Sequence, residues 1–151
     1  MKKLSLICKK LNFLIIVKQH QDILTDFKNL ENVVLFNSEI KSEKLIKYCD
    51  IFITDYSSSG ILAVLEKKFL LVLNFLDEDF PSNNYDKFGV AKKITDTYNL
   101  EKNLYDIEYG KFEIKDYQKN FENFKKLFNK NNYSNATSEV INNFVINNLY
   151  Q

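Results

Sequence analysis

The chain has 151 residues, of which 45% are hydrophobic, and its 21 basic and 20 acidic side chains leave a formal net charge of +1. This composition excludes a disordered chain, and the balanced charge argues against binding of a nucleic-acid polymer, which needs a clearly basic face. No apolar run approaches the roughly 18 residues of a membrane span, so no transmembrane segment is expected. Every basic residue is a lysine. Without a guanidinium group, any anion site must use lysine, hydroxyl groups or helix N-termini.

Continuous apolar runs of strand length alternate with segments of helical periodicity in the first half of the chain. The strands are expected at residues 13–17, 33–36, 51–54 and 70–75, and the helices at residues 4–11, 23–30, 42–48 and 58–68. Runs that do not alternate with polar residues are typical of strands buried on both faces of a parallel sheet. The pattern predicts an α/β fold, a single Rossmann-like three-layer domain over residues 1–151 with right-handed crossovers.

After residue 75 the pattern changes. Residues 76–89 contain the only proline and are expected to form a loop. The aromatic side chains within residues 115–129 recur at helical spacing and predict a core-facing helix. A final helix at about residues 135–149 is expected to pack back onto the sheet, whereas residues 94–113 give no clear assignment.

The strand at residues 51–54 runs into Thr54-Asp55-Tyr56-Ser57-Ser58-Ser59-Gly60 and then into a helix. In an open parallel sheet, ligands bind at the carboxyl ends of strands, close to helix N-termini. The serines and the glycine are expected to offer free backbone N–H groups and hydroxyl donors, supported by Thr54 and Asp55. These groups predict a phosphate site. The alternative is simple helix capping by Ser58 or Ser59, which accounts for only one serine.

A second candidate group follows the first strand. Lys18 and His20, the only histidine, are expected at the same edge of the sheet as the serines. An imidazole whose pKa lies near neutrality can act as a general base or bind phosphate, and Lys18 adds a positive charge. The alternative is that His20 is a structural or surface residue.

These segments resemble a known family. The pattern Lys18-x-His20, followed by Cys49-Asp50-Ile51-Phe52-Ile53 and then Thr54-Asp55-Tyr56-Ser57-Ser58, is similar to the C-terminal half of the CDP-glycerol glycerophosphotransferases. These are bacterial teichoic-acid and capsule polymerases of the GT-B fold. The resemblance covers nearly the whole chain, and the Thr-Asp-Tyr-Ser-Ser element is its most specific part.

The resemblance implies a substrate and a reaction. Ser57, Ser58, Ser59, Gly60 and Lys18 would bind the diphosphate of CDP-glycerol, and His20 would be the catalytic residue beside the transferred phosphoryl group. An acceptor hydroxyl on a cell-wall or capsule polymer would attack the glycerol-bearing phosphate, and CMP would leave. No metal and no separate cofactor are expected. The family also implies a cytoplasmic protein, peripheral at the inner face of the plasma membrane.

The sequence departs from the family pattern in two respects. Leu62 occupies the position where related donor sites place an acidic residue, and Phe69 replaces a proline. The N-terminal half of a GT-B enzyme is also expected to be absent. Either the gene is truncated, or a separate chain or a second copy supplies the other half, or the sequence is an excised domain. The alternatives are a nucleotide-sugar glycosyltransferase fragment and a non-catalytic remnant or interaction module.

Overall fold

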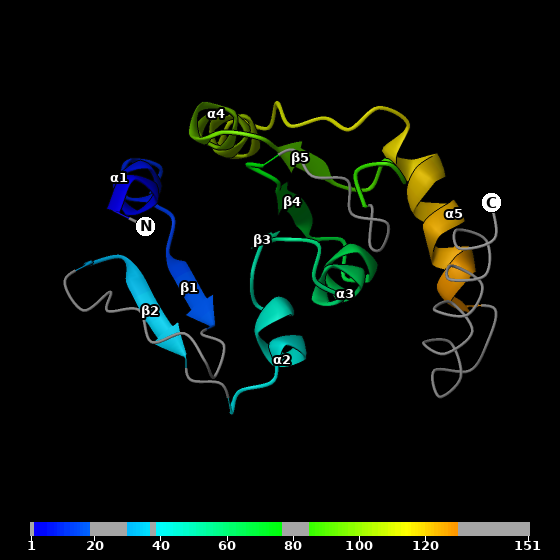
Figure 1. Cartoon of the computed structure of the whole chain (residues 1–151), viewed down its shortest axis with the longest axis horizontal. Coiled ribbons are helices and arrows are strands. Elements are labelled where there is room, and N and C mark those ends of the chain that lie inside the picture. The colour runs from blue at the N-terminus through cyan, green and yellow to red at the C-terminus, as the bar shows by residue number, and fades with distance from the viewer. Residues whose placement is uncertain (1, 19–29, 37–38, 77–84, 130–151) are drawn as a thin grey trace. The chain divides into compact units, whose positions relative to one another are not determined.

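The computed structural model describes residues 2–18, 30–36, 39–76 and 85–129 (Figure 1). Within these residues, helices and strands follow one another as α1 (Lys2–Lys10), β1 (Ile15–Lys18), β2 (Val33–Phe36), α2 (Ser42–Ile46), β3 (Ile51–Thr54), α3 (Ser59–Leu65), β4 (Phe69–Leu73), β5 (Lys92–Ile94), α4 (Thr97–Glu108) and α5 (Tyr117–Asn129). No helix among the described residues has the length and apolar character required to span a bilayer.

The chain divides into two compact units. The first unit comprises Met1–Cys49 and Asp96–Phe112, and the second comprises Asp50–Thr95 and Glu113–Gln151. In the first, β1 and β2 pair in parallel, and α1 contacts α4. In the second, β3, β4 and β5 form a parallel sheet with β4 in the middle. The predicted α/β class with parallel strands is therefore confirmed, and the single domain stays a prediction.

The predicted strand bounds hold for β2 and β3, and shift for β1 and β4. The shift at β1 has a local cause. Asn12 adopts a left-handed conformation with φ 57°, and the Phe13 N–H donates to the Cys8 carbonyl over 2.7 Å. This is the hydrogen bond that closes a helix with a left-handed terminal residue. Phe13, the first residue of the apolar run, therefore ends α1 instead of opening β1.

Two elements were not predicted. The strand β5 is short, and lysine occupies two of its positions, so it lacks the apolar run that marked the others. Helix α4 lies in the segment that gave no assignment. Its N-cap is Asp96, whose side chain accepts from the Asn99 N–H over 2.7 Å, and a capping aspartate is a signal that the sequence does carry. The helices expected at 23–30 and 135–149 lie outside the described residues, apart from Leu30, which is not helical.

The core of the second unit lies around β4. Leu70, Leu71 and Val72 are consecutive and at most 1% exposed, so both faces of this strand are covered, as predicted. In β1, by contrast, burial alternates along the strand. Ile16 and its lateral partner Val34 are both more than one-third exposed. The expectation of burial on both faces is therefore wrong for this pair, and Leu35 on the opposite face is also more than one-third exposed.

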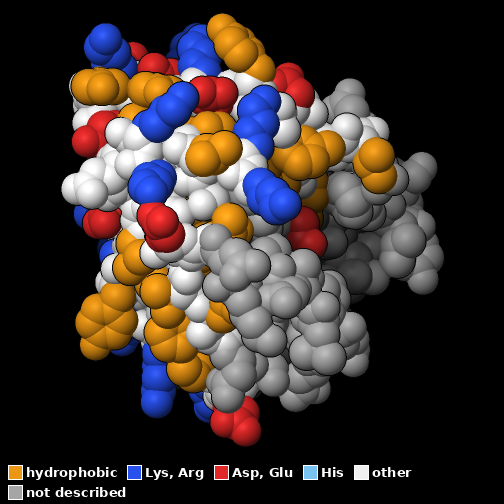
Figure 2. Space-filling model, turned by 90° about the vertical axis from the view of Figure 1, so that its left-hand side faces the viewer, with side chains coloured by type: hydrophobic (Ala, Val, Ile, Leu, Met, Phe, Trp, Pro, Cys, Tyr) orange, Lys and Arg blue, Asp and Glu red, His pale blue; other side chains and the backbone are white. Residues whose placement is uncertain are grey.

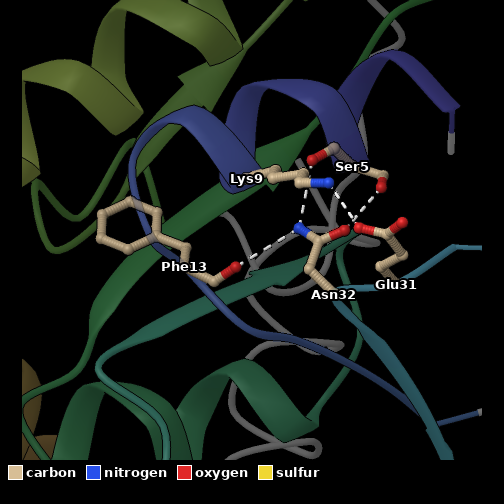
Figure 3. Close-up of polar contacts among 5 residues, drawn as sticks. All are labelled: Ser5, Lys9, Phe13, Glu31 and Asn32. Atoms are coloured by element: carbon tan, nitrogen blue, oxygen red, sulfur yellow. Dashed lines mark hydrogen bonds and ion pairs between the residues drawn. The ribbon is translucent and has the colours of Figure 1, made fainter.

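Asn32 joins helix α1 to the start of the first sheet. Its Nδ2 donates to the carbonyl of Ser5 over 3.1 Å and to the carbonyl of Phe13 over 3.3 Å. Its Oδ1 accepts from the Ser5 hydroxyl over 2.6 Å. Figure 3 shows the amide between these groups, with the Lys9–Glu31 ion pair beside it. Since Ser5 is only 6% exposed, Asn32 satisfies polar groups that water reaches poorly.

Replacing Asn32 with alanine should lower the free energy of unfolding by about 2 kcal/mol, because buried polar groups of Ser5 would lose their partners. Urea denaturation followed by circular dichroism measures this change. The control is Glu31→Gln, which breaks an ion pair whose side chains are both well exposed and should leave the midpoint unchanged. An Asn32→Ala midpoint equal to that of the wild type would contradict the prediction.

Candidate functional site

Most of the predicted site residues lie on one continuous segment of the second unit. Thr54 is the last residue of β3 and Ser59 the first of α3, so the connection between them leaves the carboxyl end of a parallel strand. We call residues 54–60 the serine turn. Asn74 directly follows β4, the strand that pairs with β3. Parallel pairing brings the ends of the two strands to the same edge of the sheet.

The other two predicted site residues, Lys18 and His20, do not belong to this segment. Lys18 ends β1 in the first unit, and its side chain is exposed. His20 lies outside the described residues. That Lys18 and His20 belong to one site with the serines stays a prediction.

The hydroxyls of the serine turn bond mainly to each other. Ser57 Oγ and Ser59 Oγ are 2.9 Å apart, and Ser57 Oγ also accepts weakly from the Ser59 N–H over 3.4 Å. Ser58 holds the N-cap position but has helical dihedral angles and makes no side-chain capping bond. The alternative of capping by Ser58 is therefore wrong, because an N-cap side chain normally needs an extended backbone to reach the helix N–H groups.

Ser57 and Ser58, the two residues before α3 begins, carry N–H groups without a partner among the described residues. The Gly60 N–H donates to the Ser57 carbonyl over 3.0 Å, and the Ile61 N–H donates to the Ser58 carbonyl over 3.1 Å. The Gly60 N–H therefore has a partner, and the expectation of a free N–H group is wrong at this residue. The N–H groups of Ser57 and Ser58 make no hydrogen bond within the described residues. With the exposed Ser58 hydroxyl, they are the donors left for a ligand.

Thr54 and Asp55 lie where β3 ends and the serine turn begins. The Thr54 hydroxyl donates to the Asp55 carboxylate over 3.3 Å, and the Asp55 side chain is exposed. This bond gives the acidic side chain a neutral partner. It agrees with a supporting role for both residues, which remains a prediction.

Asn74 and Tyr85 were not among the predicted site residues. Each donates a hydrogen bond to the serine turn from another segment of the chain. Tyr85 is 1% exposed, and its hydroxyl donates to the Ser57 carbonyl over 2.8 Å. Burial raises the pKa of Tyr85 well above its usual value, although a hydrogen bond from the Ile61 N–H opposes the shift. The phenol therefore keeps its proton at neutral pH. Asn74 is 3% exposed, and its Nδ2 donates to the Tyr56 hydroxyl over 3.2 Å.

Gly60 provides the space that Tyr85 occupies. A Cβ atom at Gly60 would lie 2.6 Å from Cε2 and 2.8 Å from Cζ of the Tyr85 ring. No real Cβ atom tolerates such contacts. The absent side chain of Gly60 therefore serves the packing of Tyr85 against α3, whereas its predicted part in phosphate binding remains a prediction.

The described residues show a mixed surface and no metal cluster. On the face drawn in Figure 2, lysine and carboxylate side chains lie among each other and beside hydrophobic ones. No group of three or more histidine, cysteine, aspartate or glutamate side chains in the described ranges could hold a metal ion. Burial raises the pKa of Cys8 to about 11, so at neutral pH this thiol is not a nucleophile.

Gly60→Ala should lower the free energy of unfolding by about 1–3 kcal/mol, the usual cost of overpacking a core. In a Tyr85→Leu background the same substitution should cost less, because the ring that the new methyl group meets is gone. Urea denaturation of both single variants and the double variant measures this coupling. Strictly additive effects would contradict the proposed contact.

A matched control is available at Gly110. Its φ is +66°, and no atom lies within 4 Å of a Cβ placed there. Gly110→Ala should therefore cost about 1 kcal/mol through backbone conformation alone, and Tyr85→Leu should not change that cost.

The chain matches no protein-family model, and neither the search of curated proteins nor the search of solved structures finds a significant match. The hydrogen-bond donors of the serine turn, their geometry and the sequence motif are therefore the basis for proposing its function.

Proposed function

We propose that this chain is the donor-binding part of a CDP-glycerol glycerophosphotransferase-like enzyme, with the serine turn binding the donor diphosphate. One observation carries the proposal. The Ser57 and Ser58 N–H groups and the exposed Ser58 hydroxyl are left as hydrogen-bond donors at the carboxyl end of β3. Consecutive N–H groups in a turn form a concave anion-binding element, and the carboxyl edge of a parallel sheet is where nucleotides bind.

The donor set suits a phosphate in a chain without arginine. Each donor is a neutral N–H or O–H group that can approach a phosphate oxygen directly. Asn74 and Tyr85 restrain the turn from two other segments, so these donors need little reorganisation when a ligand arrives. Preorganised donors are the kind of electrostatic stabilisation that phosphoryl transfer requires.

The proposed reaction is a phosphoryl transfer. An acceptor hydroxyl oxygen forms a bond to the glycerol-bearing phosphorus, and the bond from that phosphorus to the oxygen of CMP breaks. The acceptor proton passes to a general base, the role proposed for His20, and negative charge leaves on CMP. Lys18 is proposed to add positive charge beside the phosphates.

The finer fold assignment belongs to the same proposal. The α/β units with parallel sheets are compatible with the second, Rossmann-like half of a GT-B enzyme. The acceptor side would then come from a separate N-terminal half or from a second copy of the chain. The enzyme would act in the cytoplasm at the inner face of the plasma membrane.

One observation favours a second function. Leu62 lies on α3 where related donor sites carry an acidic residue, and an alkyl side chain cannot accept a hydrogen bond from ribose. A chain that has lost this contact would bind nucleotides weakly, if at all. This supports the non-catalytic interaction module as the second candidate, and a glycosyltransferase fragment is weakened in the same way.

Calorimetric titration tests donor binding. We expect CDP-glycerol to bind, and we expect Ser58→Ala to weaken it about tenfold to a hundredfold, since one hydroxyl bond to a charged group is lost. Ser42→Ala, which removes a hydroxyl at the start of α2, is the control and should leave the affinity unchanged. If CDP-glycerol, CMP and UDP-sugars all failed to bind, the non-catalytic function would replace the proposed one.

His20→Ala should lower CMP release at least a hundredfold, in an assay that supplies the complementary half, because a general base typically contributes about that factor. The affinity for CDP-glycerol should change little, since the diphosphate is assigned to the serine turn. Turnover that survived the substitution would remove His20 from the reaction.

A further inference from the structure

The peptide unit between Ser57 and Ser58 is held from one side only. Its carbonyl oxygen, which belongs to Ser57, accepts from the Tyr85 hydroxyl over 2.8 Å and from the Gly60 N–H over 3.0 Å. Both lone pairs of the oxygen are therefore used. The N–H of the same peptide unit belongs to Ser58 and has no partner within the described residues.

A peptide unit is planar, so its carbonyl and its N–H point in opposite directions. The two bonds that fix the Ser57 carbonyl consequently fix the direction of the Ser58 N–H. Because the carbonyl points toward buried Tyr85, the N–H points away from it, and Ser58 itself is exposed. The Ser57 hydroxyl is engaged with Ser59, which leaves Ser58 as the outward donor.

The Tyr85 side chain is itself well restrained. Its ring lies against Gly60, where a Cβ atom would clash with it. On another side it approaches Phe124 of α5, with ring centroids 6.3 Å apart. Its backbone carbonyl accepts from the Val90 N–H over 3.0 Å. A hydroxyl held at a fixed place by ring packing and by backbone bonding can orient the group to which it donates.

We propose that Tyr85 is a positioning residue, which orients the Ser57–Ser58 peptide so that the Ser58 N–H faces the phosphate of a bound donor. The inference rests on the proposed function of the serine turn and adds a specific role to it. Tyr85 itself would touch no substrate. It would affect ligand binding only through its hydrogen bond to the Ser57 carbonyl oxygen.

Tyr85→Phe tests this role, because it removes the hydroxyl and keeps the ring that packs on Gly60. Tyr117→Phe is the matched control: Tyr117 belongs to the same unit, burial likewise raises its pKa, and its ring stacks on Phe121 instead of contacting the turn. We expect Tyr85→Phe to raise the Kd of CDP-glycerol about fivefold to tenfold, the effect of losing one oriented hydrogen bond. Tyr117→Phe should leave it unchanged.

A second measurement reports on the peptide itself. The amide ¹⁵N resonance of Ser58 is sensitive to hydrogen bonding at the preceding carbonyl, so it should move in Tyr85→Phe and stay in place in Tyr117→Phe. Added CDP-glycerol should shift the Ser58 amide proton downfield in the wild type and less so in Tyr85→Phe. A general loss of stability would not single out this one amide.

The outcomes separate the inference from the proposed function. If CDP-glycerol binds the wild type and Tyr85→Phe equally well, the role of Tyr85 is wrong and the donor site stands. If the wild type does not bind CDP-glycerol, the proposed function falls, and inorganic pyrophosphate becomes the probe. A pyrophosphate-induced shift of the Ser58 amide that requires the Tyr85 hydroxyl would then support the inference, and the absence of that shift would overturn it.

Discussion

Strand β4 is the constraint on which the second unit depends. It pairs in parallel with β3 on one side and β5 on the other, and its residues Leu70, Leu71 and Val72 are almost completely buried. A slip by one residue would exchange the side chains of the two covered faces, and the close packing of a buried core opposes such an exchange. The register with β3 in turn places Asn74 at the edge that the serine turn leaves, where its amide reaches Tyr56.

The serine turn shows how a polar loop is held by a small number of buried groups. Tyr85 reaches the Ser57 carbonyl only because Gly60 has no side chain, so the glycine and the tyrosine form one interdependent contact. A second glycine is used similarly, since a Cβ at Gly89 would meet the Asn120 amide. In a chain with very few glycines, Gly60 serves close packing, and Gly89 serves both packing and a left-handed φ of 66°, whereas the left-handed position after α3 is occupied by Lys67.

The absence of arginine and the geometry of the turn would both shape anion recognition at the proposed site. With no guanidinium group to form a bidentate clamp, specificity has to come from the direction of single donors. A planar peptide whose carbonyl is fixed by two hydrogen bonds is a rigid way of directing one N–H group. In the proposed site, a buried phenol would therefore act on a phosphate that it does not touch.

The sequence by itself determined the α/β class, the bounds of β2 and β3 and the position of the serine turn after a strand, because these follow from contiguous apolar runs and from polar residues next to them. It could not reveal β5, because two of the three residues of this strand are lysines and no apolar run marks it. It also could not reveal the contacts of Tyr85 and Asn74 with the serine turn, which join residues 28 and 18 positions apart. Nor could it show which N–H groups are free. Only the tertiary structure decided which N–H groups of the serine turn have partners in the part of the chain that it describes, because the Ser57 carbonyl, which accepts from the Gly60 N–H, is oriented by Tyr85, a residue distant in the chain.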